Sequence, residues 1–359
     1  MADEYLLQLM SEKLAGIISP EDNRLLEESI RTNPATRQAW ETYCARFSES
    51  DIREGFSRAD AIAWQPLPLR SRTFRKTIIY ITSAAAVAAG ICFFILRPAP
   101  AAAPDTVTTG VRLVMADGRE LHAETAPQVN GVKMDNTGLQ VDEAAVTAPS
   151  AAMNTLYVPP GKSYRVTLPD STTIWVNASS TLRFPSTFPG NSRKVELTGE
   201  AYFEVASDAQ RPFMVESGGG EVTVLGTSFN IRAYDAGTGS VALISGGVKV
   251  RYGNREVILS PGREAAWSDS EDLAERDFRK EEVTGWKDGA YYFDDAPLTA
   301  IADVIRQWYG VEVRVTGEAR FSGRLDRQLP LAAFLRQLEA TGTFSHATLP
   351  NGTIQLTAR

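Results

Sequence analysis

An uncharged stretch at residues 78–96 constrains the fold of this chain more than any other feature, because about 19 consecutive residues lack a charged side chain. At roughly 1.5 Å per residue, a helix of that length measures about 28 Å, close to the hydrocarbon thickness of a bilayer. A buried core helix of this length is uncommon, and a secretory signal peptide would begin near residue 1. The sequence therefore predicts one transmembrane helix that places the protein in a lipid bilayer.

The charges beside this stretch predict its orientation. Arg70, Arg72, Arg75 and Lys76 lie in the basic segment 70–77 before it, whereas Arg97 alone follows it closely. Cytoplasmic flanks carry the excess of Lys and Arg. We therefore expect a single-pass protein of the bacterial inner membrane, with its N-terminus in the cytoplasm and its C-terminal bulk in the periplasm.

Residues 1–69 read as short amphipathic helices separated by stop signals. Apolar residues recur at helical spacing up to Gly16, and Ser19-Pro20-Glu21-Asp22 has the arrangement of a capping box. Another helix is expected after Asn33-Pro34. The segment is acidic, so direct binding to nucleic acid phosphates is not expected. The sequence predicts an all-α bundle that binds a protein partner.

The remainder divides into a stalk and two domains. Residues 97–110 form a proline- and alanine-rich stalk, and residues 111–283 contain short, glycine-punctuated strands, which predict an all-β domain of sandwich or solenoid type. Residues 284–359 alternate strand and helix patterns in the order β-α-β-β-α-β-β. The expected fold class is thus multidomain: an N-terminal all-α bundle, one transmembrane helix, a periplasmic all-β domain and a C-terminal α+β domain.

No pattern in the sequence predicts catalysis, a metal site or a cofactor site. The only histidines, His122 and His346, are far apart and lack the spacing of metal ligands. Asp294-Asp295 precedes a proline-started helix, where helix capping is favoured over a catalytic or metal-binding pair. Gly218-Gly219-Gly220 has no helix after it and indicates a hairpin loop. We expect a protein that acts by binding and is not an enzyme.

Several short stretches of the outer segment form a specific set of motifs: Leu168-Pro169-Asp170, Ile174-Trp175-Val176-Asn177, Gly199-Glu200-Ala201-Tyr202-Phe203-Glu204-Val205, Arg211-Pro212-Phe213, Val224-Leu225-Gly226-Thr227-Ser228-Phe229-Asn230, Trp286-Lys287-Asp288-Gly289 and Trp308-Tyr309-Gly310-Val311. With these motifs the chain closely resembles one family, the FecR-type anti-sigma factors of cell-surface signalling, in the form common in Bacteroidetes. The chain departs from the family pattern at Ser171, where the turn usually has glycine, and at Ile244-Ser245-Gly246-Gly247, where an acidic residue before glycine is common.

The resemblance implies a transmembrane relay that regulates transcription of iron or glycan uptake genes. Its expected partners are an extracytoplasmic-function sigma factor, the signalling domain of a TonB-dependent outer-membrane transporter, and an intramembrane protease that releases the cytoplasmic part. The C-terminal domain is similar to the short N-terminal domain of secretins and TonB-dependent receptors. Candidate contacts with the sigma factor are Leu6, Leu9, Leu14, Leu25, Trp40 and Tyr43, and candidate contacts with the transporter are Tyr291, Phe293, Trp308 and Tyr309. The alternative is a membrane-anchored periplasmic protein that binds a ligand or the cell wall.

Overall fold

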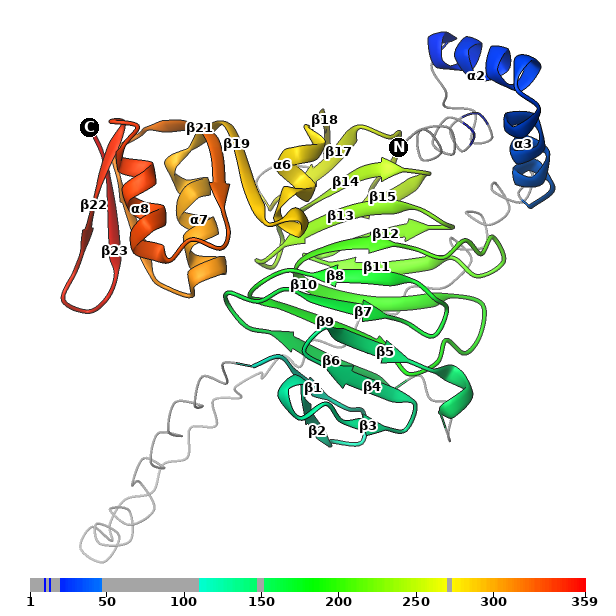
Figure 1. The fold of residues 1–359 in the computed structure, drawn as a ribbon, viewed down its shortest axis with the longest axis horizontal. Helices are drawn as coiled ribbons and strands as arrows, with labels where there is room; N and C mark the ends of the chain where they lie inside the picture. The colour runs from blue at the N-terminus through cyan, green and yellow to red at the C-terminus, as the bar shows by residue number, and fades with distance from the viewer. Residues whose placement is uncertain (1–9, 11–12, 14–19, 47–109, 147–151, 270–272) are drawn as a thin grey trace, which may run out of the picture. The chain divides into compact units, whose positions relative to one another are not determined.

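The computed structural model describes residues 10, 13, 20–46, 110–146, 152–269 and 273–359 (Figure 1). Two helices of 13 residues each make up most of the described N-terminal part: α2 at Pro20–Thr32 and α3 at Pro34–Arg46. Leu26 and Met10 are fully buried between them, and Ile30, Ala39 and Trp40 pack beside this pair. The Asn33 side chain accepts hydrogen bonds from the backbone N–H groups of Ala35 and Thr36, which caps α3.

The expected fold class is wrong, because the described chain is mostly β and its described N-terminal part consists of two helices that do not make an all-α bundle. The core of the two described N-terminal helices contains only two fully buried apolar side chains, fewer than a bundle requires. The predicted span at 78–96 lies outside the described residues. Within the described ranges, no helix is long and apolar enough to cross a membrane.

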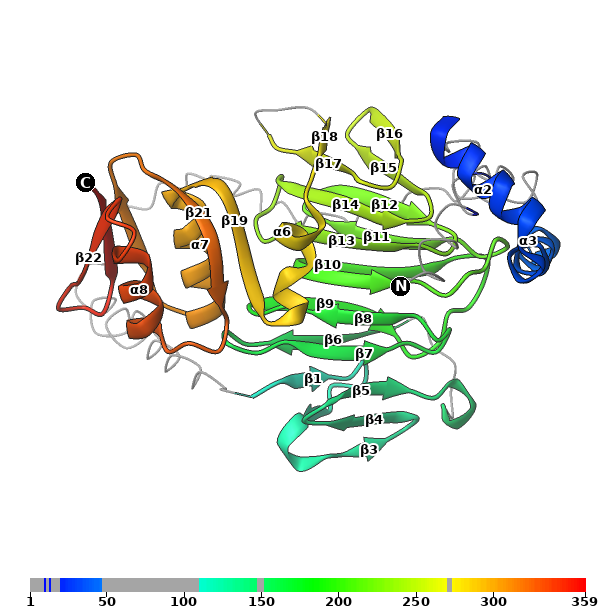
Figure 2. The ribbon, with the colours of Figure 1, turned by 45° about the horizontal axis from the view of Figure 1, so that its top comes forward.

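Residues 112–277 form two mostly antiparallel sheets (Figures 1 and 2). One sheet extends from β2 to β16, and the other extends from β3 to β18. The first sheet has the order β2 (Glu120–His122), β1 (Arg112–Val114), β6 (Met153–Val158), β9 (Ser180–Pro185), β10 (Arg193–Glu204), β11 (Phe213–Ser217), β12 (Gly220–Val224), β15 (Val248–Tyr252) and β16 (Arg255–Leu259). The second has β3 (Gln128–Val129), β4 (Val132–Asp135), β5 (Gly138–Val141), β7 (Tyr164–Thr167), β8 (Thr173–Val176), β10 again, β13 (Ser228–Ala233), β14 (Gly239–Ser245), β17 (Arg263–Trp267) and β18 (Ala274–Asp277).

Strand β10 belongs to both sheets because it bends at Gly199. Its first half pairs with β9 and β11, and its second half pairs with β8 and β13. Gly199 has a φ of +115°, and a Cβ there would lie 2.2 Å from the hydroxyl oxygen of Ser180. Only glycine tolerates that backbone and that approach, which explains the glycine in the Gly199–Val205 motif.

The inward-facing residues of both sheets form one apolar core. Ile174, Phe203 and Phe229 are fully buried, and the Phe203 and Phe229 rings stack with centroids 4.8 Å apart. Strands alternate inward and outward residues, so the neighbours of these residues point to the opposite face. The three residues lie in adjacent strands β8, β10 and β13 of the second sheet, and the outward face of those strands carries Trp175, Glu200, Tyr202 and Asn230.

The C-terminal domain begins after α6 (Lys280–Thr284) and the short 3-10 helix η3 (Gly285–Asp288). Its elements are β19 (Ala290–Pro297), α7 (Leu298–Tyr309), β20 (Val313–Thr316), β21 (Arg320–Asp326), α8 (Leu331–Glu339), β22 (Phe344–Thr348) and β23 (Ile354–Ala358). This element order is the predicted β-α-β-β-α-β-β. The strands pair as β19–β21 and as β20–β23–β22, and both helices are drawn between these two sheets in Figure 1.

Two expectations at turns have different outcomes. The hairpin loop expected at residues 218–220 is confirmed, since Ser217 pairs with Gly220 and both intervening glycines have positive φ. The capping role expected for Asp294-Asp295 is wrong. Both residues lie within β19, the N-cap of α7 is Pro297, and the two carboxylates form ion pairs with Arg279 and Arg320 at 2.7 and 2.8 Å.

Candidate functional site

The outward face of the second sheet contains polar and aromatic residues that are nevertheless buried. On this face Glu200 lies opposite Arg232, and Tyr202 lies between Trp175 and Asn230 in the strand register. Glu200 is 4% exposed and Asn230 is 3% exposed. These side chains are shielded because the C-terminal domain packs on them, and Tyr202 and Trp175 belong to its apolar cluster.

A closed ring of hydrogen bonds joins this face to the C-terminal domain. The Glu200 carboxylate accepts from the side-chain amide of Asn177 at 2.8 Å and from that of Asn230 at 3.1 Å. The Asn230 carbonyl accepts from the indole N–H of Trp286 at 3.2 Å, and the Asn177 carbonyl accepts from the guanidinium of Arg327 at 3.1 Å. Arg327 closes the ring by donating to the backbone carbonyl of Trp286.

Arg327 is held inside a cage of aromatic rings. Its guanidinium carbon lies 3.7 Å from the ring centroid of Trp308, and 5.7 and 5.8 Å from those of Tyr291 and Trp286. The Trp308 indole N–H in turn donates to the Arg327 carbonyl at 2.8 Å. Cation–π contacts are strongest when desolvated, so the buried cation and its cage stabilise one another.

Two further sets of contacts lie beside the ring. We call the ring and these two sets of contacts together the Arg327 seam. Ser179 donates to the backbone carbonyl of Gln307 at 2.8 Å, and Arg232 approaches the Gln307 side chain at 3.5 Å. On the other side, the Lys287 ammonium lies over the rings of Trp175 and Tyr202, at 5.1 and 5.2 Å from their centroids. The seam therefore includes residues from η3, from the C-terminal end of α7 and from the turn that follows β21.

Burial shifts the titration of the charged groups in the seam. Desolvation lowers the pKa of the Arg327 guanidinium, against the opposing influence of Tyr291 and Glu200. Burial is the largest single influence on Arg232 and works against its charge, but Glu200 together with Tyr234, Asp303 and Tyr291 outweighs it and raises the pKa of that guanidinium. Burial raises the pKa of the Tyr291 phenol to about 12. Glu200 is thus a carboxylate that favours the charged forms of both Arg327 and Arg232.

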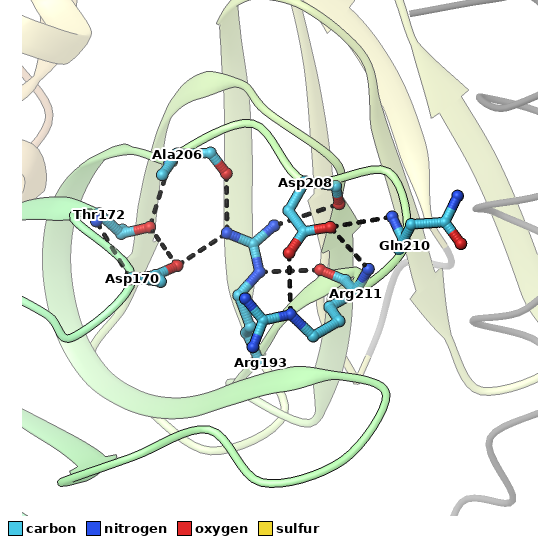
Figure 3. A network of polar contacts seen from close by, with 7 residues as sticks. All are labelled: Asp170, Thr172, Arg193, Ala206, Asp208, Gln210 and Arg211. Carbon is cyan, nitrogen blue, oxygen red and sulfur yellow. Dashed lines mark hydrogen bonds and ion pairs between the residues drawn. The ribbon is translucent and has the colours of Figure 1, made fainter. Parts of the chain in front are cut away.

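A second polar network holds the centre of the β domain together (Figure 3). Arg193 is fully buried and forms an ion pair with Asp170 at 2.7 Å. It also donates to the backbone carbonyls of Ala206 and Arg211, at 2.7 and 2.8 Å, while Asp170 accepts from the Thr172 hydroxyl at 2.7 Å. Arg193 therefore links two of the family motifs. It forms an ion pair with the Asp170 side chain of Leu168-Pro169-Asp170, and it donates to the backbone carbonyl of Arg211 in Arg211-Pro212-Phe213.

The four residues predicted to contact a transporter all lie in or beside the C-terminal apolar cluster. Tyr291 is 8% exposed, and Phe293 packs against it and against Phe321. Trp308 covers Arg327, and the Tyr309 hydroxyl donates to the Leu329 carbonyl at 2.7 Å. The structure brings these aromatic residues together as a packed set, and their contact with a transporter stays a prediction.

The residues predicted to contact a sigma factor are described only in part. Leu6, Leu9 and Leu14 lie outside the described residues, and Tyr43 lies in α3 without a described side chain. Leu25 is 52% exposed on α2, while Trp40 packs against the small core around Leu26. Of the six, Leu25 is the one that the structure shows on an open helix surface.

Sequence patterns did not identify the residues that make most of the contacts in the two polar networks. Arg193 and Arg327 look like ordinary surface residues in a strand pattern, and the sequence does not distinguish whether Glu200 is a surface residue or part of a partner face. One signal was present for Glu200, Asn177, Asn230 and Trp286, since each lies in a motif of the resembling family. In the described part of the chain, no group of three or more His, Cys, Asp or Glu side chains is arranged to hold a metal ion.

Comparison with known proteins identifies the family of these two domains. Residues 154–249 match the family model "FecR protein", and residues 290–355 match the model "FecR, C-terminal". None of the curated proteins matches the sequence.

Two crystal structures, each of a candidate anti-sigma factor from Parabacteroides distasonis ATCC 8503, resemble the chain. Both are 27% identical in sequence, with TM-scores of 0.52 and 0.53. The similarity covers 57% and 58% of this chain and 99% of each of those chains. The matched models cover both sides of the Arg327 seam, and the chain therefore belongs to the family of FecR-type anti-sigma factors.

Proposed function

We propose that this FecR-type anti-sigma factor binds an extracytoplasmic-function sigma factor through its acidic N-terminal helices. The observation that carries the proposal, beyond the family itself, is Leu25. It is 52% exposed on α2, and only one other large apolar side chain, Ile258, is comparably exposed among the described residues. An exposed leucine next to acidic side chains such as Glu28 suits a partner surface that is apolar with a basic rim.

The proposed signal comes from a TonB-dependent outer-membrane transporter and reaches the C-terminal domain. Strand β20 supports this proposal, because among the described strands it pairs only with β23 and so leaves its other edge open. A cavity of about 560 Å³ lies beside it, lined by residues that include Leu298, Thr299, Val315 and Arg320. An open edge next to a groove suits the addition of a strand from a partner domain.

The proposed location follows from these two partners. The N-terminal helices would meet the sigma factor in the cytoplasm, and the β and C-terminal domains would meet the transporter in the periplasm, at the bacterial inner membrane. Release of the N-terminal part by regulated intramembrane proteolysis completes the proposed relay. Fusions of a cytoplasmic and a periplasmic reporter to each end of the chain test this arrangement, and activity of the same reporter at both ends would contradict it.

The sigma-factor proposal is tested by co-purification. The tagged full-length chain is expected to capture a sigma factor, and Leu25→Glu is expected to reduce that capture at least tenfold, because a charge replaces the exposed apolar contact. Ile258→Glu makes the same kind of change at a comparably exposed apolar residue of the β domain and serves as the matched control. Capture by Leu25→Glu at the wild-type level would refute the role of Leu25. Absence of any sigma factor with the wild-type chain would favour a periplasmic ligand- or wall-binding protein instead.

The transporter proposal is tested by titrating the full-length chain with the signalling domain of a transporter. Thr299 lines the groove and is exposed, so Thr299→Trp fills the groove without disturbing the core. We expect it to weaken binding at least tenfold. Gln328→Trp places the same ring at an exposed position that does not line the groove. Equal affinities for the two variants would show that the partner binds elsewhere.

A further inference from the structure

We propose that the Arg327 seam is a latch: the FecR C-terminal domain separates from the β domain as an intact body when the ring around Arg327 opens. The inference concerns the two domains of this chain alone and does not depend on which sigma factor or transporter it meets. It rests on the closed hydrogen-bond ring, on the burial of a cation without a directly bonded carboxylate, and on the places where the seam residues lie.

The first step is that the ring opens as a whole. Asn177 uses its amide N–H for Glu200 and its carbonyl for Arg327, and Asn230 uses its amide N–H for Glu200 and its carbonyl for Trp286. Neither asparagine can therefore turn to replace a lost partner without losing a second one. Loss of Arg327 leaves the carbonyls of Asn177 and Trp286 without this donor, so one broken contact weakens its neighbours.

The second step is that the closed seam includes the unfavourable desolvation free energy of the Arg327 guanidinium, which the open seam does not. Within the described part of the chain, Arg327 has no carboxylate at hydrogen-bond distance, and its Nε atom is buried without a partner. The nearest link to negative charge is Glu200, reached through Asn177. A buried guanidinium with unfilled hydrogen-bonding capacity is poorly compensated for its lost hydration. Water recovers that hydration when the domains separate, which makes the seam easier to open than an apolar interface of the same area.

The third step is that each domain keeps its own core when the seam opens. The β domain is held by a separate apolar cluster and by the buried Arg193–Asp170 pair, neither of which includes a residue of the C-terminal domain. The C-terminal domain has its own fully buried residues, including Ile301, Phe334 and Leu338. Three β-domain residues pack with the second cluster, namely Trp175, Tyr202 and Ile244. Opening therefore exposes a limited surface and leaves both interiors closed.

The latch is tested by hydrogen–deuterium exchange of the full-length chain with the Arg327→Ala variant. We expect backbone amides on both sides of the seam, at 175–178, 229–232, 286–289 and 307–311, to exchange at least about tenfold faster, because the loss of a charged hydrogen bond costs about 1.5–3 kcal/mol. Amides in β11, β12 and α8 are expected to keep wild-type rates. Arg324→Ala removes an exposed arginine in β21, the strand just before Arg327, where it contacts Tyr292; this variant is the matched control and is expected to change none of the seam segments.

The remaining variants make the outcome decisive. Asn177→Ala removes the same hydrogen bond from the β-domain side and should give the same pattern, whereas Arg327→Lys keeps the charge but cannot reach both carbonyls at once and should give an intermediate one. Faster exchange confined to residues 324–330 would overturn the proposal. Faster exchange throughout both domains, in both Arg327→Ala and Asn177→Ala, would also overturn it, since the two domains would then unfold as one unit.

Discussion

Replacement of Glu200 by glutamine is the sharpest test of the hydrogen-bond ring, because it changes one oxygen to an NH₂ group and leaves the shape nearly unchanged. The carboxylate accepts two amide N–H groups, from Asn177 at 2.8 Å and from Asn230 at 3.1 Å. A glutamine NH₂ group must face one of these donors. Both asparagines have their carbonyls committed elsewhere, so neither can rotate without breaking a contact with Arg327 or Trp286.

The magnitude follows from these contacts. One hydrogen bond to a charged group is lost, worth about 1.5–3 kcal/mol, and a buried donor is left facing another donor. The negative charge that offsets Arg327 and Arg232 is lost as well. We expect Glu200→Gln to destabilise the folded chain by about 3 kcal/mol, which corresponds to a fall in Tm of roughly 6–12 °C for about 250 ordered residues.

Thermal unfolding at neutral pH, followed by circular dichroism, measures this effect. Glu204→Gln is the matched control, since Glu204 lies on the same strand and points to the same face but is exposed. We expect it to shift Tm by no more than about 1–2 °C, as most surface substitutions do. A Tm for Glu200→Gln equal to that of Glu204→Gln would refute the claim that Glu200 holds the ring together.

Three further predictions concern other parts of the structure. Ser171 has a φ of +69°, which glycine adopts freely and serine does not, so Ser171→Gly is expected to stabilise the chain by about 0.5–1 kcal/mol in urea unfolding, whereas Ser171→Ala is not. Arg193→Met leaves Asp170 buried without its cation and is expected to lower the free energy of unfolding by about 3–5 kcal/mol. Arg183→Met, at an ion pair whose side chains are 42% and 21% exposed, is expected to lower it by less than about 1 kcal/mol. Equal effects of the two variants on the urea midpoint would contradict the role of burial. Burial raises the pKa of Tyr291 from 10.0 to about 12, so the stability that its protonated phenol contributes is fully present below pH 10 and is lost between pH 10 and 12, at up to about 1.4 kcal/mol per pH unit. Tyr291→Phe is expected to remove this contribution to the pH dependence of the free energy of unfolding, measured from pH 9 to 12.

Local pattern was sufficient wherever the physical cause of a structure is local. The first helix of the predicted β-α-β-β-α-β-β order is α7, and it ends where Gly310 takes the left-handed conformation that stops a helix, with a φ of +65°. The hairpin loop predicted at Gly218-Gly219-Gly220 joins β11 to β12 and turns at two glycines of positive φ. The absence of glycine at Ser171 was also visible in the sequence, and the structure explains it as a left-handed turn position.

The bundle prediction failed for a physical reason that concerns packing. Caps and helical spacing in residues 20–46 correctly indicated helices, but they do not tell how many neighbours each helix has. Among the described residues, the apolar core beside these helices contains only two fully buried side chains, Met10 and Leu26. Helix existence is a local property, whereas a bundle requires enough apolar faces to enclose a core.

The strands, the turns, the two C-terminal helices and the motifs that mark the family can be read from the amino-acid sequence. The contacts that those motifs make depend on how the distant parts of the chain pack together. Glu200 alternates with the buried Ala201 and therefore reads as a surface position, yet the C-terminal domain covers it. Asn177 and Arg327 are 150 residues apart in the chain and meet at 3.1 Å. Periodicity reports which face of a strand points away from its own core, but only the folded chain determines whether another domain then buries that face.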